Sequence, residues 1–265
     1  ALLEILGIPY SGSGPQCLAF CYDKSLVRGI AKEMNIPVAD GIYISQEDLS
    51  YDFLPFNFPV IVKPNFGDSS FGITQRNFVT SKEDLINVIK EIRERFGYEN
   101  PILIEEFLEG ADLSVGIIGN PPENYKVLPI SEEDYSVLPE ELPKICGYEA
   151  KWLSDSPYWS LKSIPARITE EKKEFIIDCC IKLFKRLECR DYCRFDWRVD
   201  KEGIPKLLEV NPNPGWCWDG HLAKMSKFAD ESYKDMLKDI LLAAENRIKN
   251  EIIKPCEELE IQISQ

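Results

Sequence analysis

Residues 192–215 read YCRFDWRVDKEGIPKLLEVNPNPG, and apolar and charged side chains alternate along the first half of this segment. Alternation with a period of two predicts a strand that packs one face on a core and turns the other toward a site. Asp200-Lys201-Glu202-Gly203 is a typical reversal, so the apolar run after it predicts the second strand of a hairpin. Arg194 and Asp196 then share the charged face of the first strand.

The second strand adds further oxygen ligands to this hairpin. Glu209 and Asn211 are two residues apart and therefore lie on one face. If that face also carries Asp196, two carboxylates and one amide oxygen come together without nitrogen or sulfur, a set that suits Mg²⁺. The alternative is a solvent-facing hairpin with scattered acidic residues.

Composition limits the classes of protein that the chain can represent. Its 265 residues include 45 acidic and 31 basic ones, giving a formal net charge of −14. An acidic chain disfavours a nucleic-acid surface, although a local basic pocket still suits a phosphorylated ligand. No apolar run reaches about 18 residues, so no membrane span or membrane partner is expected. The first residues lack a signal-peptide pattern, and we expect a cytoplasmic protein.

The nine cysteines do not form a recognisable ligand pattern. Their number is odd, no pair has Cys-x-x-Cys spacing, and His221 is the only histidine. We therefore do not expect a structural zinc site. The thiols are predicted to be reduced and mostly buried as small apolar side chains.

Two upstream segments suit a nucleotide. Lys63 follows an apolar strand, and the loop after it contains Ser69, Ser70 and two glycines, so backbone N–H groups and hydroxyls can cover phosphate oxygens. Residues 104–112 run from a strand into an extended segment that can offer backbone groups to adenine, with Asp112 accepting from ribose hydroxyls. An ordinary turn and ordinary surface acids are the alternatives.

The remaining pattern sets the fold class. Helices are predicted after Asp23, Ser81 and Thr169, and a last helix covers roughly 231–248. The Pro-rich, acidic segment 121–143 predicts a solvated loop. Strands alternate with helices, so the class is α/β or α+β.

The order of these segments resembles the ATP-grasp superfamily and, within it, the D-alanine:D-alanine ligase group. Residues 8–14, 23–24 and 148–151 also match landmarks of that group, so the resemblance spans nearly the whole chain. It implies two α/β lobes with antiparallel sheets that clamp ATP. We expect residues 1–22 to be a remnant of an N-terminal domain, 23–111 the central lobe with the phosphate loop, and 112–265 the C-terminal catalytic lobe.

The resemblance also implies roles for individual residues. Two Mg²⁺ ions, with Mn²⁺ as an alternative, would be held by Asp196, Glu209 and Asn211. The group expected at the reacting centre is Arg194, Lys151, Ser69 and the backbone N–H of Gly215. Contacts with ATP are implied for Lys24, Lys63, Ser69, Ser70, Glu105, Phe107, Leu108, Asp112 and Lys151.

Departures from the group concern the substrates. Trp152 stands where those ligases usually carry a tyrosine, and residues 216–222 replace their Ser-Leu pair. We expect substrate contacts from Trp152, Trp216, Trp218, Asp219 and His221. Asp219 would repel a carboxylate but could hold an ammonium group, and His221 could replace the hydroxyl donor. Alternatively, the two later tryptophans only wall the pocket.

Three functions follow. The leading one is an ATP-dependent carboxylate–amine ligase that joins amino acids or related small acids through an acyl-phosphate intermediate. The second is a true D-alanine:D-alanine ligase of cell-wall synthesis with a divergent pocket. The third is a non-catalytic ATP-binding regulatory module. The expected partners are small-molecule carboxylates and amines, and the oligomeric state is left open, with a homodimer as one option.

Overall fold

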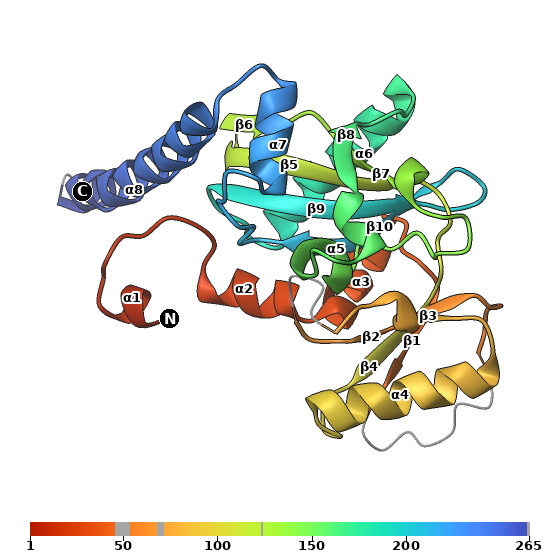
Figure 1. Ribbon diagram of the computed structural model, residues 1–265. Helices are drawn as coiled ribbons and strands as arrows, with labels where there is room; N and C mark the ends of the chain where they lie inside the picture. Colours follow the sequence, from red (N-terminus) through yellow and green to blue (C-terminus); the bar gives the residue numbers. More distant parts are fainter. Residues whose placement is uncertain (46–53, 68–71, 123, 264–265) are drawn as a thin grey trace.

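Two antiparallel sheets organise the chain, and both are visible in the computed structural model (Figure 1). The structure describes residues 1–45, 54–67, 72–122 and 124–263. The smaller sheet has the strand order β1-β4-β2-β3, and α4 (Lys82–Phe96) packs its apolar stripe on that sheet. Its strands are β1 (Gly41–Ile44), β2 (Val60–Pro64), β3 (Phe78–Val79) and β4 (Ile102–Glu106).

The larger sheet has six strands in the order β10-β9-β5-β7-β8, with β6 paired to β5. These strands are β5 (Asp112–Asn120), β6 (Asn124–Val127), β7 (Ser131–Asp134), β8 (Lys162–Pro165), β9 (Tyr192–Val199) and β10 (Pro205–Asn211). The short turns and helices near the two sheets are α1 (Leu2–Ile5), η1 (Gln75–Asn77), η2 (Tyr135–Val137), α5 (Tyr148–Trp152) and η3 (Pro157–Ser160).

Longer helices complete the hydrophobic cores of the larger sheet. On one side, α2 (Pro15–Tyr22), α3 (Lys24–Glu33) and α6 (Glu170–Arg186) pack with the apolar residues of β9. A second core joins β5 to α7 (His221–Phe228) and α8 (Tyr233–Ile263). Among the helices of the described residues, none combines the length and apolar composition that crossing a membrane requires.

The predicted hairpin and helix starts are confirmed. The β9 residues Cys193, Phe195 and Trp197 are fully buried, so the apolar side chains of the alternating segment pack on the core. Asp200 Oδ1 accepts from the N–H of Ile204 at 2.8 Å in the reversal. The predicted caps are formed as well, since the side chains of Asp23, Ser81 and Thr169 each accept from a backbone N–H in the first turn.

Two expectations about the elements are wrong. Residues 121–143 include β6 and β7 rather than a solvated loop, because Tyr125 and Val127 pack on the core of the larger sheet. Helix α2, for which no prediction was made, begins at Pro15, and proline is well suited to the first position of a helix. The last helix continues to Ile263 instead of ending near residue 248.

Helix α3 packs with the larger sheet, whereas the predicted lobe boundary at residue 23 assigns this helix to the central lobe. Val27 and Ala31 of this helix lie in the core of the six-stranded sheet, although residues 23–111 were expected to form the central lobe. The N–H of Leu207 also donates to Pro37 O at 2.8 Å, so the segment after α3 contacts β10. The segment before β1 therefore packs with the larger sheet.

Candidate active site

A cleft of about 900 Å³ is lined by residues of both sheets. Strands β2 and β4 contribute from the smaller sheet, and β5, β9 and β10 contribute from the larger one. Most of the residues expected to form the site line this cleft: Lys24, Lys63, Glu105, Phe107, Leu108, Asp112, Lys151, Arg194, Asp196, Glu209 and His221.

The side of the cleft formed by the smaller sheet carries a buried ionic cluster. The carboxylate of Glu105 is 1% exposed and pairs with both Arg28 and Lys63. Removing charges from water is costly, so a buried carboxylate needs such partners. Two cations share one carboxylate here, which leaves this cluster with an excess of positive charge.

Lys24 connects α3 to the beginning of the predicted phosphate loop. Its ammonium donates to the carbonyl of Gly67, and its N–H donates to Asn65 O at 3.2 Å. The Asn65 amide in turn donates to Asp23 Oδ1 at 2.8 Å, so the Asp23-Lys24 landmark holds the start of the loop. The predicted phosphate contacts Ser69 and Ser70 lie outside the described residues.

Helix α5 places Lys151 at the cleft and contacts the chain just after that loop. Glu149 Oε1 accepts from the N–H of Gln75 at 3.0 Å, and the N–H of Tyr148 donates to Ile73 O at 2.7 Å. These contacts join α5 to the smaller sheet's lobe across the cleft.

The segment between β4 and β5 supplies the apolar part of the cleft. The ring of Phe107 meets that of Phe78 edge to face at 4.7 Å, and the Arg198 guanidinium lies 4.7 Å from the centre of the Phe107 ring. Asp112 accepts from the hydroxyl of Tyr135 at 2.7 Å. Burial raises the pKa of Asp112, although the charge of Arg198 opposes that rise.

The charged face of β9 is an ordered pair of side chains. Two nitrogens of Arg194 each donate to one oxygen of Asp196 at 2.8 Å, and Ser114 Oγ donates to Asp196 Oδ1 at 2.7 Å. Burial raises the pKa of Asp196, but Arg194 outweighs it and the pKa falls to about 2. Asp196 is therefore ionised at neutral pH.

Strand β10 brings its two predicted ligands to the same face of the sheet. In the register, Glu209 lies opposite Asp196, and Asn211 lies opposite Arg194. Glu209 lines the cleft, whereas Asn211 lines an adjoining hollow together with Glu209 and Gly67. The Asn211 Oδ1 atom accepts from the N–H of Asn213 at 3.0 Å, which fixes the side chain where the strand ends.

Of the expected substrate residues, only His221 lines the cleft within the described part of the chain. Trp152 and Trp218 are 61% and 76% exposed, and Asp219 is exposed as well. The Trp216 ring packs against Tyr192 at 5.2 Å instead. Gly215, expected at the reacting centre, is exposed and does not line the cleft either.

Sequence reasoning missed a polar pair in the cleft. Glu133 of β7 is buried, accepts from Ser163 Oγ at 2.6 Å, and lies 3.7 Å from Nδ1 of His221. Burial raises the pKa of Glu133; burial, followed by the charge of Arg194, lowers that of His221 to about 3. The segment Ser131-Glu132-Glu133 contains no apolar residue that would mark a core face, so its sequence pattern did not indicate this pair.

Other cleft residues were also not anticipated. Ser114 and Cys146 line the cleft, and Arg28 lies behind it as a partner of Glu105. Each comes from a position whose neighbours in sequence give no functional pattern, so only the folded chain shows its location.

Comparisons with known proteins agree with this geometry. The family model for the D-ala D-ala ligase C-terminus matches residues 30–242. A D-alanine–D-alanine ligase of Halalkalibacterium halodurans is 32% identical over 243 residues, which are 90% of this chain and 74% of that protein. The uncharacterised protein y4sG of Sinorhizobium fredii is 30% identical over 247 residues, covering 93% of this chain and 69% of that protein.

A solved structure gives the same result for the fold. The D-alanine–D-alanine ligase of Bacillus anthracis, crystallised in complex with ATP, matches with a TM-score of 0.75 at 28% identity. The match covers 94% of this chain and 75% of that one. The chain therefore belongs to the D-ala D-ala ligase family and is an ATP-dependent carboxylate–amine ligase with the ATP-grasp fold.

Proposed function

We propose that this ligase activates a small carboxylate of the amino-acid class with ATP and joins it to an amine. The observation that carries the proposal is the single cleft in which Lys63 and Lys151 lie together with the ordered Arg194–Asp196 pair. Phosphoryl transfer to a carboxylate depends on positioning and on cations that neutralise phosphate charge. An acyl phosphate then reacts with the amine, and phosphate leaves.

The residues expected to bind magnesium have suitable chemistry. Asp196 and Glu209 offer carboxylates, Asn211 offers an amide oxygen, and the guanidinium of Arg194 pairs with Asp196. Hard oxygen donors with excess negative charge suit Mg²⁺, with Mn²⁺ as the alternative. We propose that these residues hold two such ions, which neutralise phosphate charge when bound.

The smaller sheet would hold the nucleotide. Lys24 and Lys63 are placed to neutralise phosphates, and we propose that Ser69 and Ser70 donate to phosphate oxygens. Phe107 and Leu108 would contact the adenine, with Asp112 accepting from the ribose. Glu105, whose carboxylate already pairs with two cations, would contact the adenine amino group while holding Lys63 in place.

The larger sheet would supply the hydrogen-bond donors to the reacting carbonyl group. Arg194 is fixed by its two bonds to Asp196, so its orientation is set before the substrate arrives. A pre-oriented donor stabilises the charge that develops in a tetrahedral species. We propose that Arg194 serves this role, with Lys151 at the transferred phosphoryl group and the Gly215 N–H as a second donor.

Glu133 and His221 support an amino-acid substrate. A buried carboxylate gains from a cationic partner, because desolvation disfavours its charge. The ammonium group of an amino acid would supply that cation at Glu133, the role that sequence reasoning gave to the exposed Asp219. Neutral His221 can still donate a hydrogen bond to a substrate carboxylate. Trp152, Trp216 and Trp218 would contact the substrate at the rim of the cleft.

A true D-alanine:D-alanine ligase is the second candidate. It is favoured by the names of the relatives, several of which are D-alanine–D-alanine ligases. The altered 216–222 segment and the Glu133–His221 pair favour a different acid or amine. The two candidates differ only in the substrates accepted.

Phosphate release tests the proposal. Purified protein with ATP and Mg²⁺ would be assayed against a panel of D- and L-amino acids, other small acids and amines. Release that requires both an acid and an amine supports the ligase, and preference for D-alanine alone selects the second candidate. Release that ignores both reactants contradicts the proposed chemistry. Light scattering on the same sample measures the oligomeric state, for which a homodimer is one option.

Asp196→Asn tests the metal assignment separately. Loss of one carboxylate should raise the Mg²⁺ concentration needed for half-maximal activity, because the site loses negative charge. An unchanged magnesium requirement contradicts the role of Asp196.

A further inference from the structure

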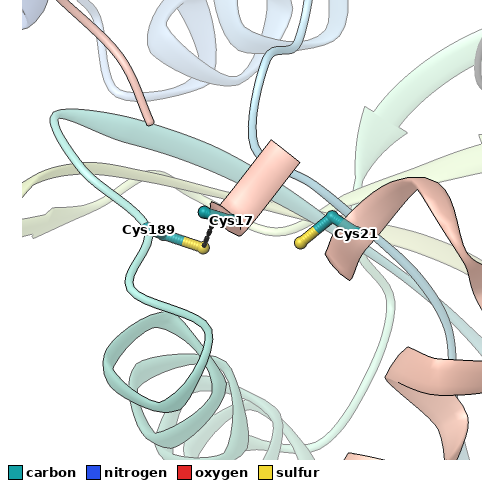
Figure 2. Close-up of side chains that lie close together, drawn as sticks. All are labelled: Cys17, Cys21 and Cys189. Carbon is teal, nitrogen blue, oxygen red and sulfur yellow. Dashed lines mark hydrogen bonds between the residues drawn. The ribbon is translucent and has the colours of Figure 1, made fainter. Parts of the chain in front are cut away.

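Three buried cysteines from separate segments meet outside the active-site cleft. Cys17 and Cys21 lie on α2, and Cys189 lies in the connection between α6 and β9. Their sulfur atoms all lie within 4.8 Å of one another, and those of Cys17 and Cys189 are 3.7 Å apart. Figure 2 shows the side chains of Cys21 and Cys189 pointing toward one another. We call these residues the thiol cluster.

The local structure explains this convergence. Residues four apart share one face of a helix, so α2 presents Cys17 and Cys21 on the same side. The three residues are 1%, 6% and 3% exposed, and all belong to the core that α2 shares with α6 and β9. The absence of Cys-x-x-Cys spacing argued against a metal site, but the tertiary fold supplies the third sulfur from a residue that is distant in sequence.

One thiol of the cluster lies in the first turn of a helix. Cys17 is the third residue of α2, where backbone N–H groups stabilise the negative charge of a thiolate.

A route from solvent reaches the cluster. Cys17 and Cys189 line an open cavity of about 1090 Å³, together with Lys185, Arg190 and Arg247. The cavity therefore brings solvent next to two of the three residues of the cluster.

We propose that Cys17, Cys21 and Cys189 bind one thiophilic metal ion, Cu(I) or Zn²⁺, as thiolates. Soft sulfur ligands select these ions over hard cations such as Mg²⁺. Each thiol that binds releases its proton to solvent, and the ion keeps its oxidation state. Three sulfurs satisfy Cu(I), whereas Zn²⁺ in structural sites takes four ligands. The fourth would come from Cys193 of β9 or from water.

Binding at this position would affect the fold near the active site. The ion would link α2 to the connection that precedes β9. The thiol of Cys193, which contacts the cluster through Cys189, donates to the carbonyl of Asn211 at 3.2 Å. A metal ion therefore stabilises the segment that supports the end of β10, and it does so by binding only the native state.

Titration with Cd²⁺ tests the site directly. The full chain is reduced with a phosphine, stripped of metal with a chelator, and titrated while thiolate-to-metal charge-transfer absorption is recorded. We expect one tightly bound ion per chain and a higher melting temperature. Cys17→Ser and Cys189→Ser should each weaken binding by at least about 100-fold, since even outer-shell changes cost 10–100-fold. Cys179→Ser, a buried thiol outside the cluster, should bind like the wild type.

Other outcomes would overturn the proposal. The first is absence of the charge-transfer band. The second is wild-type affinity in Cys17→Ser and Cys189→Ser, and the third is a loss of affinity in Cys179→Ser as large as in those two variants. A Cys17–Cys189 disulfide that survives treatment with the phosphine would also overturn it. If a serine variant loses its circular dichroism spectrum, Cys21→Ala replaces it. Competition between Zn²⁺ and Cu(I) in the presence of chelators then identifies the ion. Since these readouts do not involve ligase activity, failure of the metal site is distinguishable from failure of the proposed reaction.

Discussion

On the smaller sheet's side of the cleft, the carboxylate of Glu105 is shared by two cations, whereas on the larger sheet's side the guanidinium of Arg194 faces two carboxylates. Both clusters are largely removed from water. Each one carries an uncompensated charge, positive on the first side and negative on the second. A buried imbalance of this kind is costly unless a ligand completes it.

The difference shows how one cleft can hold ligands of both signs. Under the proposed function, phosphates would complete the positive cluster at Lys63, and divalent cations would complete the negative cluster at Asp196 and Glu209. The two ligands then lie between the lobes and attract each other, so each should bind more tightly when the other is present. The following changes test the two sides separately.

The largest effect is expected for Glu209→Gln on the negative side. Replacing the carboxylate by an amide removes the charge that would retain the proposed metal ions while preserving the side-chain shape. Turnover should fall by at least about 10³-fold, as measured by ADP release, with an unchanged circular dichroism spectrum. The matched control is Glu202→Gln in the exposed reversal between β9 and β10, which should retain full activity. Full activity in Glu209→Gln would contradict the magnesium assignment.

Glu105→Gln makes the corresponding change on the positive side. Arg28 and Lys63 would be left buried without an anion, so the free energy of unfolding should fall by about 3 kcal/mol. Urea denaturation measures the loss. Because ATP phosphates can supply the missing negative charge, ATP should stabilise the variant more than the wild type. Equal stabilisation by ATP would show that the cation cluster does not meet the phosphates.

A smaller effect concerns His221, which lies on the negative side and is nevertheless neutral. Its pKa is lowered to about 3 by burial and by Arg194, whereas an unfolded histidine titrates near 6.5. Below that value the unfolded chain binds the proton first, so stability falls as pH decreases. His221→Gln removes this cost. At pH 5 the wild type should have lost about 2 kcal/mol more than the variant, relative to pH 7.5.

The control for this experiment is the comparison at and above pH 7.5, where His221 is neutral in both the folded and the unfolded chain. The difference in stability between the wild type and His221→Gln should not change with pH in this range. Parallel stability curves for the two proteins between pH 7.5 and 5 would show that His221 protonates as readily in the folded chain as in the unfolded one.

The sequence was sufficient to predict an element and its orientation where one face of that element is apolar. The alternation from Cys193 to Val199 predicted the strand, its buried face and the charged face that lines the cleft, since sheet geometry alone fixes these features. The pairing of Glu209 with Asp196, by contrast, depends on a register shift between Leu207 and Glu209, which the sequence pattern did not predict. The sequence therefore indicated which residues to consider as ligands on β9 and β10, and the irregularity of the hairpin brings them opposite one another.

The same reasoning failed where both faces of a strand are polar. Strand β7 (Ser131–Asp134) consists of polar residues, and Glu133 lines the cleft, so no apolar alternation marks the strand. The tryptophans at 216 and 218 were placed by resemblance in order along the chain. The positions of their side chains depend on the folded chain instead. The Trp216 ring, for example, packs against Tyr192 and the second core. The thiol cluster was missed for a similar reason, since only tertiary structure joins residue 189 to α2.

The smallest predicted effect concerns the contact that joins the two sides. Glu149 Oε1 accepts from the N–H of Gln75 at 3.0 Å, and this hydrogen bond connects α5, which carries Lys151, to the segment after the phosphate loop. Glu149→Ala should raise the KM for ATP about fivefold, equivalent to about 1 kcal/mol for one hydrogen bond. Glu149→Gln keeps the acceptor oxygen and should leave the KM near the wild-type value. If both variants have the wild-type KM for ATP, the contact does not contribute to ATP binding. If the KM rises in both variants, the charge of Glu149 matters rather than its hydrogen bond. Only a rise in Glu149→Ala that is absent in Glu149→Gln assigns the connection between the positive and negative sides to this acceptor oxygen.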